Sequence, residues 1–339
     1  MKYKLFILML CAGLLLSCSN EFDLQTTEDS VPVVYFFMNP ADSIFHLTLT
    51  RTFSGDESGY DLAQDPNEVY YQKADIRLEG WANQYKVWES GFLLTDHSKE
   101  PGIFTGMPGF CYETKNEFSQ VQSDNTIANN YNDITDFRLV LNLPGMDIPV
   151  ISRISSVPIP VRIHPATPMR IFDLCPDGSN YKAGIQFDKD KVKYCELICL
   201  FRYQVYQSID RPWISDSVTF TLRKNIPIYD DKAITILDTE FFFTRLADNI
   251  TPINDTIVRK FNSLDLVFLV GDKYFQTYYD TYINSGNVDS PPAGNISHGI
   301  GLFTMVRSIK LEKNMTMTYR TLDFLSSSEY TRQLGFIRW

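Results

Sequence analysis

Apolar residues recur at every second position in several segments of this 339-residue chain, and this alternation constrains its fold more than any other feature. From Phe45 to Phe53, apolar side chains alternate with His46 and with threonines. From Tyr194 to Val205, every second residue is apolar or aromatic. Successive side chains of a β-strand point to opposite faces, so this pattern indicates half-buried strands. We therefore expect a mainly β fold.

Short strands separated by turn residues predict two β-sandwich-like domains, similar to immunoglobulin or fibronectin type III modules. Prolines at positions 158, 160, 165 and 168 favour extended chain and remove ladder donors, which makes this segment the best boundary. We expect an N-terminal β-sandwich domain over residues 31–158 and a C-terminal one over residues 159–339.

A few helices are predicted within the C-terminal domain. Thr239 is a candidate cap for a helix near residues 240–250, and Asp272 for a helix over residues 272–284. The second helix carries two rows of aromatic residues at helical spacing. We interpret these rows as core packing, with a binding face as the alternative.

The N-terminus has the pattern of an export signal. Lys2 and Lys4 precede an apolar stretch from Leu5 to Leu16, which is shorter than the ~20 residues that span a bilayer. The sequence Leu15-Leu16-Ser17-Cys18 resembles the lipobox of bacterial lipoproteins. This resemblance implies a signal peptide over residues 1–17, lipidation of Cys18, and a tether over residues 18–30. The alternative is an ordinary signal peptide with an incidental cysteine.

The charge of the chain narrows the expected partners and location. Glu21 and Asp23 follow the cysteine closely and resemble the signal that sends Bacteroidota lipoproteins to the outer face of the outer membrane. The formal net charge of −10 argues against nucleic acid as a partner and against electrostatic binding to an anionic membrane.

Four cysteines remain once Cys11 is removed with the signal and Cys18 is lipidated. They are Cys111, Cys175, Cys195 and Cys199. Cys195 and Cys199 lie too far apart along one strand to pair with each other. We expect four buried thiols, with a bridge from Cys175 to Cys195 or Cys199 as the alternative.

The sequence predicts neither a metal site nor a cofactor. Its four histidines, His46, His97, His164 and His298, each lie more than five residues from any other histidine or cysteine. Residues 54–68 are acidic but lack the ligand spacing of an EF-hand, so we expect a solvated loop there. Catalytic motifs such as GxSxG and HExxH are absent. We expect no enzyme, with a surface hydrolase built from distant residues as the alternative.

Several segments together resemble one family. They are VPVVYFFMNPADSIFHLTLTRTFSG, ADIRLEG, PGIF, FRLVLNLPGMDIPVISR and GNISHGIGLF. They are similar to a Bacteroidota family of outer-membrane lipoproteins known as domain of unknown function 4249, from about residue 18 to the C-terminus. The most specific stretch is Asn295–Phe303, where the family pattern is Asn-Ile, two variable residues and Gly-x-Gly-x-Phe. His298 stands where a small residue is more common.

The resemblance implies no catalytic residue. It singles out Asn295, His298, Gly299 and Gly301 as a candidate ligand or partner loop. The structural interpretation is that the glycines adopt positive φ or admit a neighbouring backbone.

Family members are commonly encoded beside TonB-dependent transporters. The resemblance therefore implies a lipid-anchored, surface-exposed outer-membrane protein that assists such a transporter in nutrient capture or uptake. The alternative is a structural, adhesive or glycan-binding surface lipoprotein without a transport partner.

Overall fold

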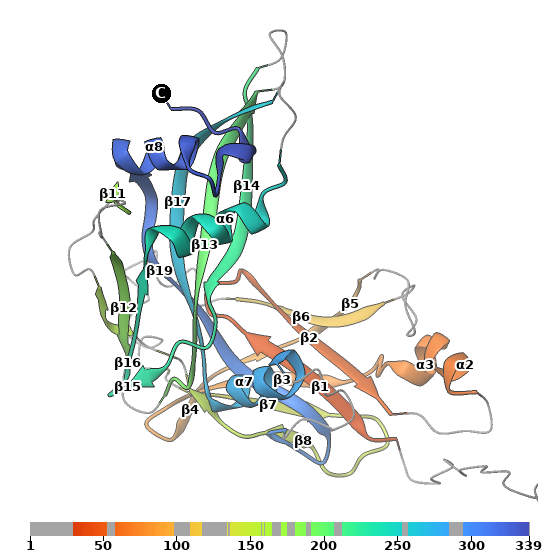
Figure 1. Cartoon of the computed structure of the whole chain (residues 1–339). Coiled ribbons are helices and arrows are strands. Elements are labelled where there is room, and N and C mark those ends of the chain that lie inside the picture. Colours follow the sequence, from red (N-terminus) through yellow and green to blue (C-terminus); the bar gives the residue numbers. More distant parts are fainter. Residues whose placement is uncertain are drawn as a thin grey trace, which may run out of the picture.

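The computed structural model describes residues 30–52, 58–97, 109–116, 134, 136–156, 158, 160–164, 171–174, 180–187, 191–206, 212–252, 257–284 and 294–338. These residues form a mainly β protein with several sheets and few helices, as the alternation predicts. Two β-sandwich-like units lie end to end (Figure 1). Each unit has its own hydrophobic cluster.

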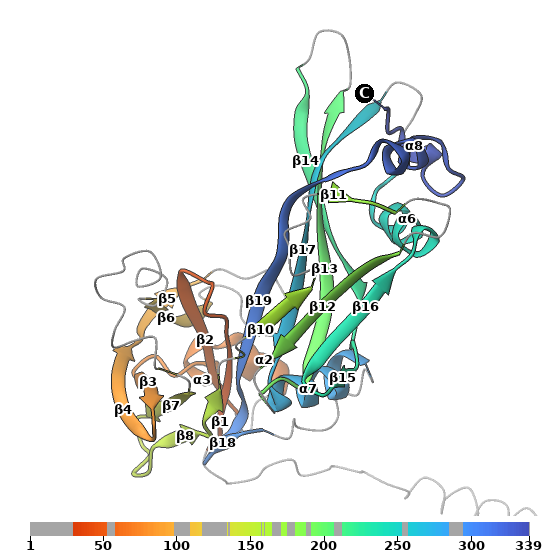
Figure 2. The same ribbon diagram turned by 90° about the vertical axis from the view of Figure 1, so that its left-hand side faces the viewer.

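The largest sheet has nine strands and extends through both units (Figure 2). Its strands follow the order β14-β13-β17-β19-β1-β2-β6-β5, and β11 pairs with β19 beside this path. Their bounds are β14 (Ile214–Arg223), β13 (Tyr194–Tyr206), β17 (Val258–Gly271), β19 (Ile300–Met317), β1 (Pro32–Met38), β2 (Ile44–Arg51), β6 (Phe110–Lys115), β5 (Leu93–Asp96) and β11 (Ile171–Phe172).

A second sheet covers one end of this large sheet and completes the first unit. Its strands follow the order β18-β8-β7-β3-β4, and β9 pairs with β7. Their bounds are β18 (Ile296–Ser297), β8 (Val150–Ser152), β7 (Asp136–Asn142), β3 (Asp75–Ala82), β4 (Tyr85–Gly91) and β9 (Ser155–Ser156). The expected alternation is present, because Phe45, Leu47 and Leu49 are buried between the sheets while His46 is exposed.

The second unit combines the other end of the large sheet with a four-stranded sheet and two helices. The small sheet has the order β10-β12-β16-β15. Its strands are β10 (Pro160–His164), β12 (Tyr181–Phe187), β16 (Lys232–Leu237) and β15 (Ile228–Tyr229), and the helices are α6 (Thr239–Asn249) and α8 (Tyr319–Ser327). Phe242 of α6 lies 4.9 Å from Phe172 and Phe243 lies 5.0 Å from Phe324 of α8, between ring centroids, which fixes both helices on the core.

Strand β19 belongs to both units. Its first residues, Ile300 to Met305, pair in parallel with β1, and its later residues pair with β17 in antiparallel fashion. Phe303 and Met305 consequently lie in the core of the first unit. The predicted domain boundary near residue 158 places all of β19 in the second domain. In the structure, the first residues of β19 belong to the first sandwich.

Helix α6 begins one residue earlier than its predicted start, because its cap is Asp238 and not Thr239. The Asp238 carboxylate accepts a hydrogen bond from the Phe241 N–H at 2.8 Å. Asp272 caps α7 (Lys273–Tyr278) as predicted, and a π-helix, η1 (Tyr279–Asn284), continues it.

The aromatic residues of α7 pack between the two units. Phe275 lies 6.2 Å from Phe37 of β1 and 4.9 Å from Tyr194 of β13, between ring centroids. Tyr278 also contacts Phe37, and Tyr279 contacts Tyr194. Tyr279 is buried, whereas Phe275 and Tyr278 are only half-buried. The core-packing interpretation therefore holds for Tyr279, while Phe275 and Tyr278 pack against neighbouring aromatic rings at a partly exposed position.

Helices are not confined to the second unit, which corrects the predicted fold. The segment expected to be an acidic loop contains α2 (Gly59–Gln64) and α3 (Pro66–Val69), in the first unit. Ser58 and Asp65 cap these two short helices through their side-chain oxygens. Helix α8 and the 3-10 turn η2 (Arg332–Leu334) were also not predicted.

Cys111, Cys195 and Cys199 are buried thiols, as expected, and Cys175 lies outside the described residues. Burial raises the pKa of both Cys195 and Cys199 far above the ordinary thiol value, so neither forms a thiolate at neutral pH. Within the described ranges, no helix combines the length and apolar character needed to cross a bilayer.

Candidate functional site

The stretch that begins at Asn295 holds the edge of the first sandwich together. The buried Asn295 amide donates to the Phe303 carbonyl at 2.6 Å and accepts from the Phe303 N–H at 2.8 Å. Its side chain therefore pairs with the backbone of β19 as a neighbouring strand would. Ser297 makes matching bonds to the backbone of Ile151 in β8.

The two glycines of this stretch allow close approach of β1. Gly301 has a φ of +119°, and a Cβ built there would lie 1.9 Å from the Val34 carbonyl oxygen. A Cβ at Gly299 would lie 3.0 Å from the Pro32 carbonyl oxygen. Only glycine fits at Gly301, because both the φ angle and the space exclude a side chain.

His298 differs from its neighbours because its side chain is exposed. It lies in the turn between β18 and β19 with a φ of +55°. The structural role of the predicted loop is to pair with or admit neighbouring backbone, through Asn295, Gly299 and Gly301. Its exposed member, His298, is the one that can contact a partner. Cys18, the predicted lipidation site, lies outside the described residues.

A second group of side chains meets on the exposed face of the first unit. His46 lies on β2, His97 directly follows β5, and Cys111 and Glu113 lie on β6 between them. His46 is directly opposite Glu113 in the ladder, and residues 111 and 113 share one face of β6. One ligand atom from each of these four residues lies within 4.8 Å of the others.

Glu113 is at the centre of this cluster. Its Oε1 atom lies 2.9 Å from Nδ1 of His46 and 2.5 Å from Nε2 of His97. The Cys111 Sγ atom lies 3.9 Å from Nδ1 of His46. The two imidazole rings meet edge to face, with centroids 5.6 Å apart.

The environment of Glu113 favours its ionised form. The hydrogen bond from His97 lowers the pKa of the Glu113 carboxyl below its ordinary value, against a smaller raising effect of burial, and His46 lowers it further. The side chains of His46 and His97 are 54% and 49% exposed, so solvent reaches the cluster. Cys111 is buried beneath them. The cluster therefore joins an anion, two imidazoles and a thiol at the surface.

The sequence alone does not reveal this cluster, because no short spacing along the chain connects its histidines with its cysteine. His46, His97 and Cys111 come from three different strands or strand ends, and the strand order β2-β6-β5 brings them together. Two local signals were available. His46 lies on the polar face of a predicted strand, and Cys111-x-Glu113 has the spacing of residues on one face.

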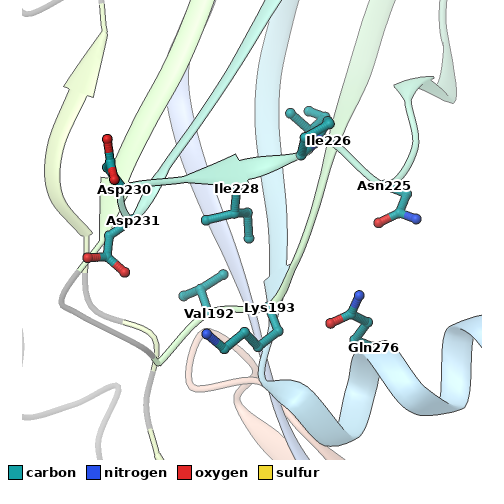
Figure 3. A pocket seen from close by; sticks show the side chains of 9 residues that line it. Val192, Lys193, Asn225, Ile226, Ile228, Asp230, Asp231 and Gln276 are labelled. Atoms are coloured by element: carbon teal, nitrogen blue, oxygen red, sulfur yellow. The ribbon is translucent and has the colours of Figure 1, made fainter.

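A pocket of about 460 Å³ lies in the second unit, between the β15–β16 turn and helix α7 (Figure 3). Asn225 and Gln276 face each other across it, and Lys193, Asp230 and Asp231 complete its polar part. The other lining residues are Val192, Ile226, Pro227 and Ile228. These groups can donate hydrogen bonds to a polar ligand and accept hydrogen bonds from it. Among the described residues that line it, no nucleophile is paired with a general base.

Asp272 is the centre of a buried polar group where the units meet. Its carboxylate accepts from Ser155 Oγ, from Thr304 Oγ1 at 2.7 Å, and from the N–H groups of Tyr274 and Phe275. All these bonds connect β9, β19 and α7. The carboxylate is therefore engaged in holding the fold, and no histidine is among these contacts.

Comparison with known proteins adds little to this geometry. No protein-family model matches the sequence, and no curated protein matches it. One solved structure with a weak likeness is the C-terminal globular domain of an oligosaccharyltransferase from Pyrococcus abyssi, at 13% identity and a TM-score of 0.22. The likeness covers 72% of this chain and 47% of that one, so this chain spans about half the length of its match. A likeness this weak carries no argument about function.

Proposed function

We propose that this protein is a lipid-anchored lipoprotein of the outer membrane, facing the cell exterior, that assists a TonB-dependent transporter in capturing or admitting a nutrient. The observation that supports the lipid anchor is the sequence Leu15-Leu16-Ser17-Cys18 at the end of a short apolar stretch. The resemblance to the Bacteroidota lipoprotein family supports the proposed role in transport.

The described fold is compatible with a protein that binds and does not catalyse. The pocket between β15 and α7 offers amide, carboxylate and ammonium groups to a polar ligand. The Asp272 group is engaged in structural hydrogen bonds. The pocket therefore supports a capture role for the protein.

An anchored Cys18 would also limit how far the first unit lies from the membrane. Pro32, where β1 begins, follows Cys18 by 14 residues. Even fully extended, this length reaches only about 50 Å. The start of β1 in the first unit would therefore lie within about 50 Å of the membrane.

Metabolic labelling with a clickable fatty acid tests the anchor. We expect the wild-type protein to be labelled and to fractionate with the outer membrane, and Cys18→Ala to lose the label. Cys11→Ala is the matched control, because it removes another cysteine of the N-terminal region and should keep the label. Label retained in Cys18→Ala would contradict the anchor.

Affinity purification from detergent-solubilised outer membranes, followed by mass spectrometry, tests the partner. We expect a TonB-dependent transporter in stoichiometric amount. Recovery of the lipoprotein alone, after mild crosslinking, would contradict the accessory role and favour a structural or adhesive role.

A further inference from the structure

We infer that His46, His97, Cys111 and Glu113 form a binding site for a divalent transition metal, with zinc as the best fit. The inference rests on their convergence, since one donor atom from each lies within 4.8 Å of the other three. It is independent of the anchor and of the transporter.

The donor set selects the class of metal. Two imidazole nitrogens, one sulfur and one carboxylate oxygen are ligands of zinc and of similar borderline metals. Calcium and magnesium take oxygen ligands almost entirely, so a thiol and two imidazoles argue against them. Within the divalent transition series, four such ligands favour zinc, which most often takes four nitrogen, sulfur and oxygen donors.

Small shifts would bring the donor atoms to the separations of a tetrahedral site. Zinc–ligand bonds of about 2.0–2.3 Å place the ligand atoms roughly 3.3–3.8 Å from each other. The separation between Cys111 Sγ and His46 Nδ1 is already 3.9 Å. Glu113 Oε1 lies closer to the two imidazoles, at 2.9 and 2.5 Å, because it now takes their hydrogen bonds. Shifts of about 1 Å would admit the metal, and the half-exposed imidazoles have the freedom to make them.

Strand β6 holds its two ligands in a fixed position. The Tyr112 hydroxyl donates to the Tyr71 carbonyl at 2.7 Å and accepts from the Ala74 N–H at 3.1 Å. Thr95 Oγ1 donates to the Cys111 carbonyl at 3.1 Å. Cys111 and Glu113 therefore come from a strand anchored on both sides, which favours a preformed site.

The rival interpretation is a carboxylate that accepts hydrogen bonds from two histidines, without a metal. That arrangement has no need of Cys111, whereas a metal site uses its sulfur directly. A spectroscopic signal from sulfur therefore separates the two interpretations.

Cobalt(II) binding to the full-length protein in detergent, under reducing conditions and with a tag that contains no histidine, is the test. We expect a near-ultraviolet thiolate-to-cobalt charge-transfer band that zinc abolishes by displacing cobalt. Cys111→Ser should lose this band. His46→Ala, His97→Ala and Glu113→Gln each remove a direct ligand. Each should weaken binding at least as much as the loss of an outer-shell partner does, which is roughly ten- to a hundredfold.

Glu89→Gln is the matched control, because Glu89 is a strand carboxylate on the other sheet that contacts Lys86 and Arg77. It should bind cobalt as the wild type does. The half-exposed His97 lies beyond the end of β5, so His97→Ala should keep the wild-type circular dichroism spectrum and urea midpoint. Absence of the thiolate band in the wild type, or its persistence in Cys111→Ser, would overturn the proposal.

Discussion

Two carboxylates on the same nine-stranded sheet have opposite surroundings. In the second unit, Asp265 of β17 is 2% exposed and faces Arg202 of β13, with N–O distances of 3.0 and 2.7 Å. It also accepts from the Asn314 N–H at 2.7 Å. In the first unit, Glu113 faces two imidazoles and lies beside a thiol. Asp265 is already neutralised by a guanidinium, whereas the groups around Glu113 can all ligate a metal.

The largest expected difference between the two regions is in stability. Asp265→Asn leaves the Arg202 guanidinium without its buried counter-ion. It should lower the free energy of unfolding by about 3 kcal/mol, the low end for a buried pair, because the Arg202 side chain is 30% exposed. Glu113→Gln, in metal-free buffer, should cost about 1 kcal/mol or less, because that cluster is half exposed. Urea denaturation of both variants measures the difference. Equal losses of unfolding free energy in the two variants would contradict the difference between the two sites.

Strand β19 connects these regions, and Gly301 is its most constrained position. Gly301→Ala would force a Cβ against the Val34 backbone at a φ of +119°. We expect a loss of roughly 3 kcal/mol in the free energy of unfolding, from overpacking and backbone strain together. Gly59→Ala is the control, since nothing lies within 4 Å of a Cβ there. A neutral Gly301→Ala would show that the contact between β1 and β19 is looser than described.

Acid should affect the Asp265 pair in a defined pH range. The Arg202 hydrogen bonds, and then the Asn314 N–H, lower the pKa of Asp265 below its ordinary value of 3.8, against the raising effect of burial. A lowered folded-state pKa adds stability that is complete above about pH 4 and is lost as pH falls through the folded value. The stability gap between wild type and Asp265→Asn should therefore narrow below about pH 4. Urea midpoints measured across this range test it, and a constant gap would contradict it.

The smallest effect is expected at His298. Asparagine tolerates the left-handed backbone of this exposed turn, so His298→Asn should change stability by no more than about 0.5 kcal/mol. Cobalt binding should also be unchanged, because His298 is not among the four clustered residues. Weaker cobalt binding in His298→Asn would place the metal elsewhere.

Local patterns predicted much of the strand content of the fold. The alternation from Phe45 and from Tyr194 identified β2 and β13, and Asp272 identified the start of α7. The short strands β5 and β6 were not predicted, because they have too few residues to show a period. The pairing of β1 with β19 could not be predicted from local patterns, since the two strands lie more than 260 residues apart in the sequence.

The candidate site could not be predicted for the same reason, because it also depends on strand pairing. The backbone role of Asn295 and Gly301 depends on a parallel partner strand that no local pattern reveals. His46 and His97 are isolated in the sequence, and only the Cys111-x-Glu113 spacing is local. A cluster made by three strands becomes visible only when the strand order is known.

Anomalous diffraction at the zinc edge, from crystals grown with stoichiometric zinc, tests the central distinction most directly. We predict a peak within about 2.0–2.3 Å of donor atoms from His46, His97, Cys111 and Glu113, and none beside Asp265. A peak elsewhere, or no peak at this cluster, would contradict the assignment of the first unit as the metal-binding region.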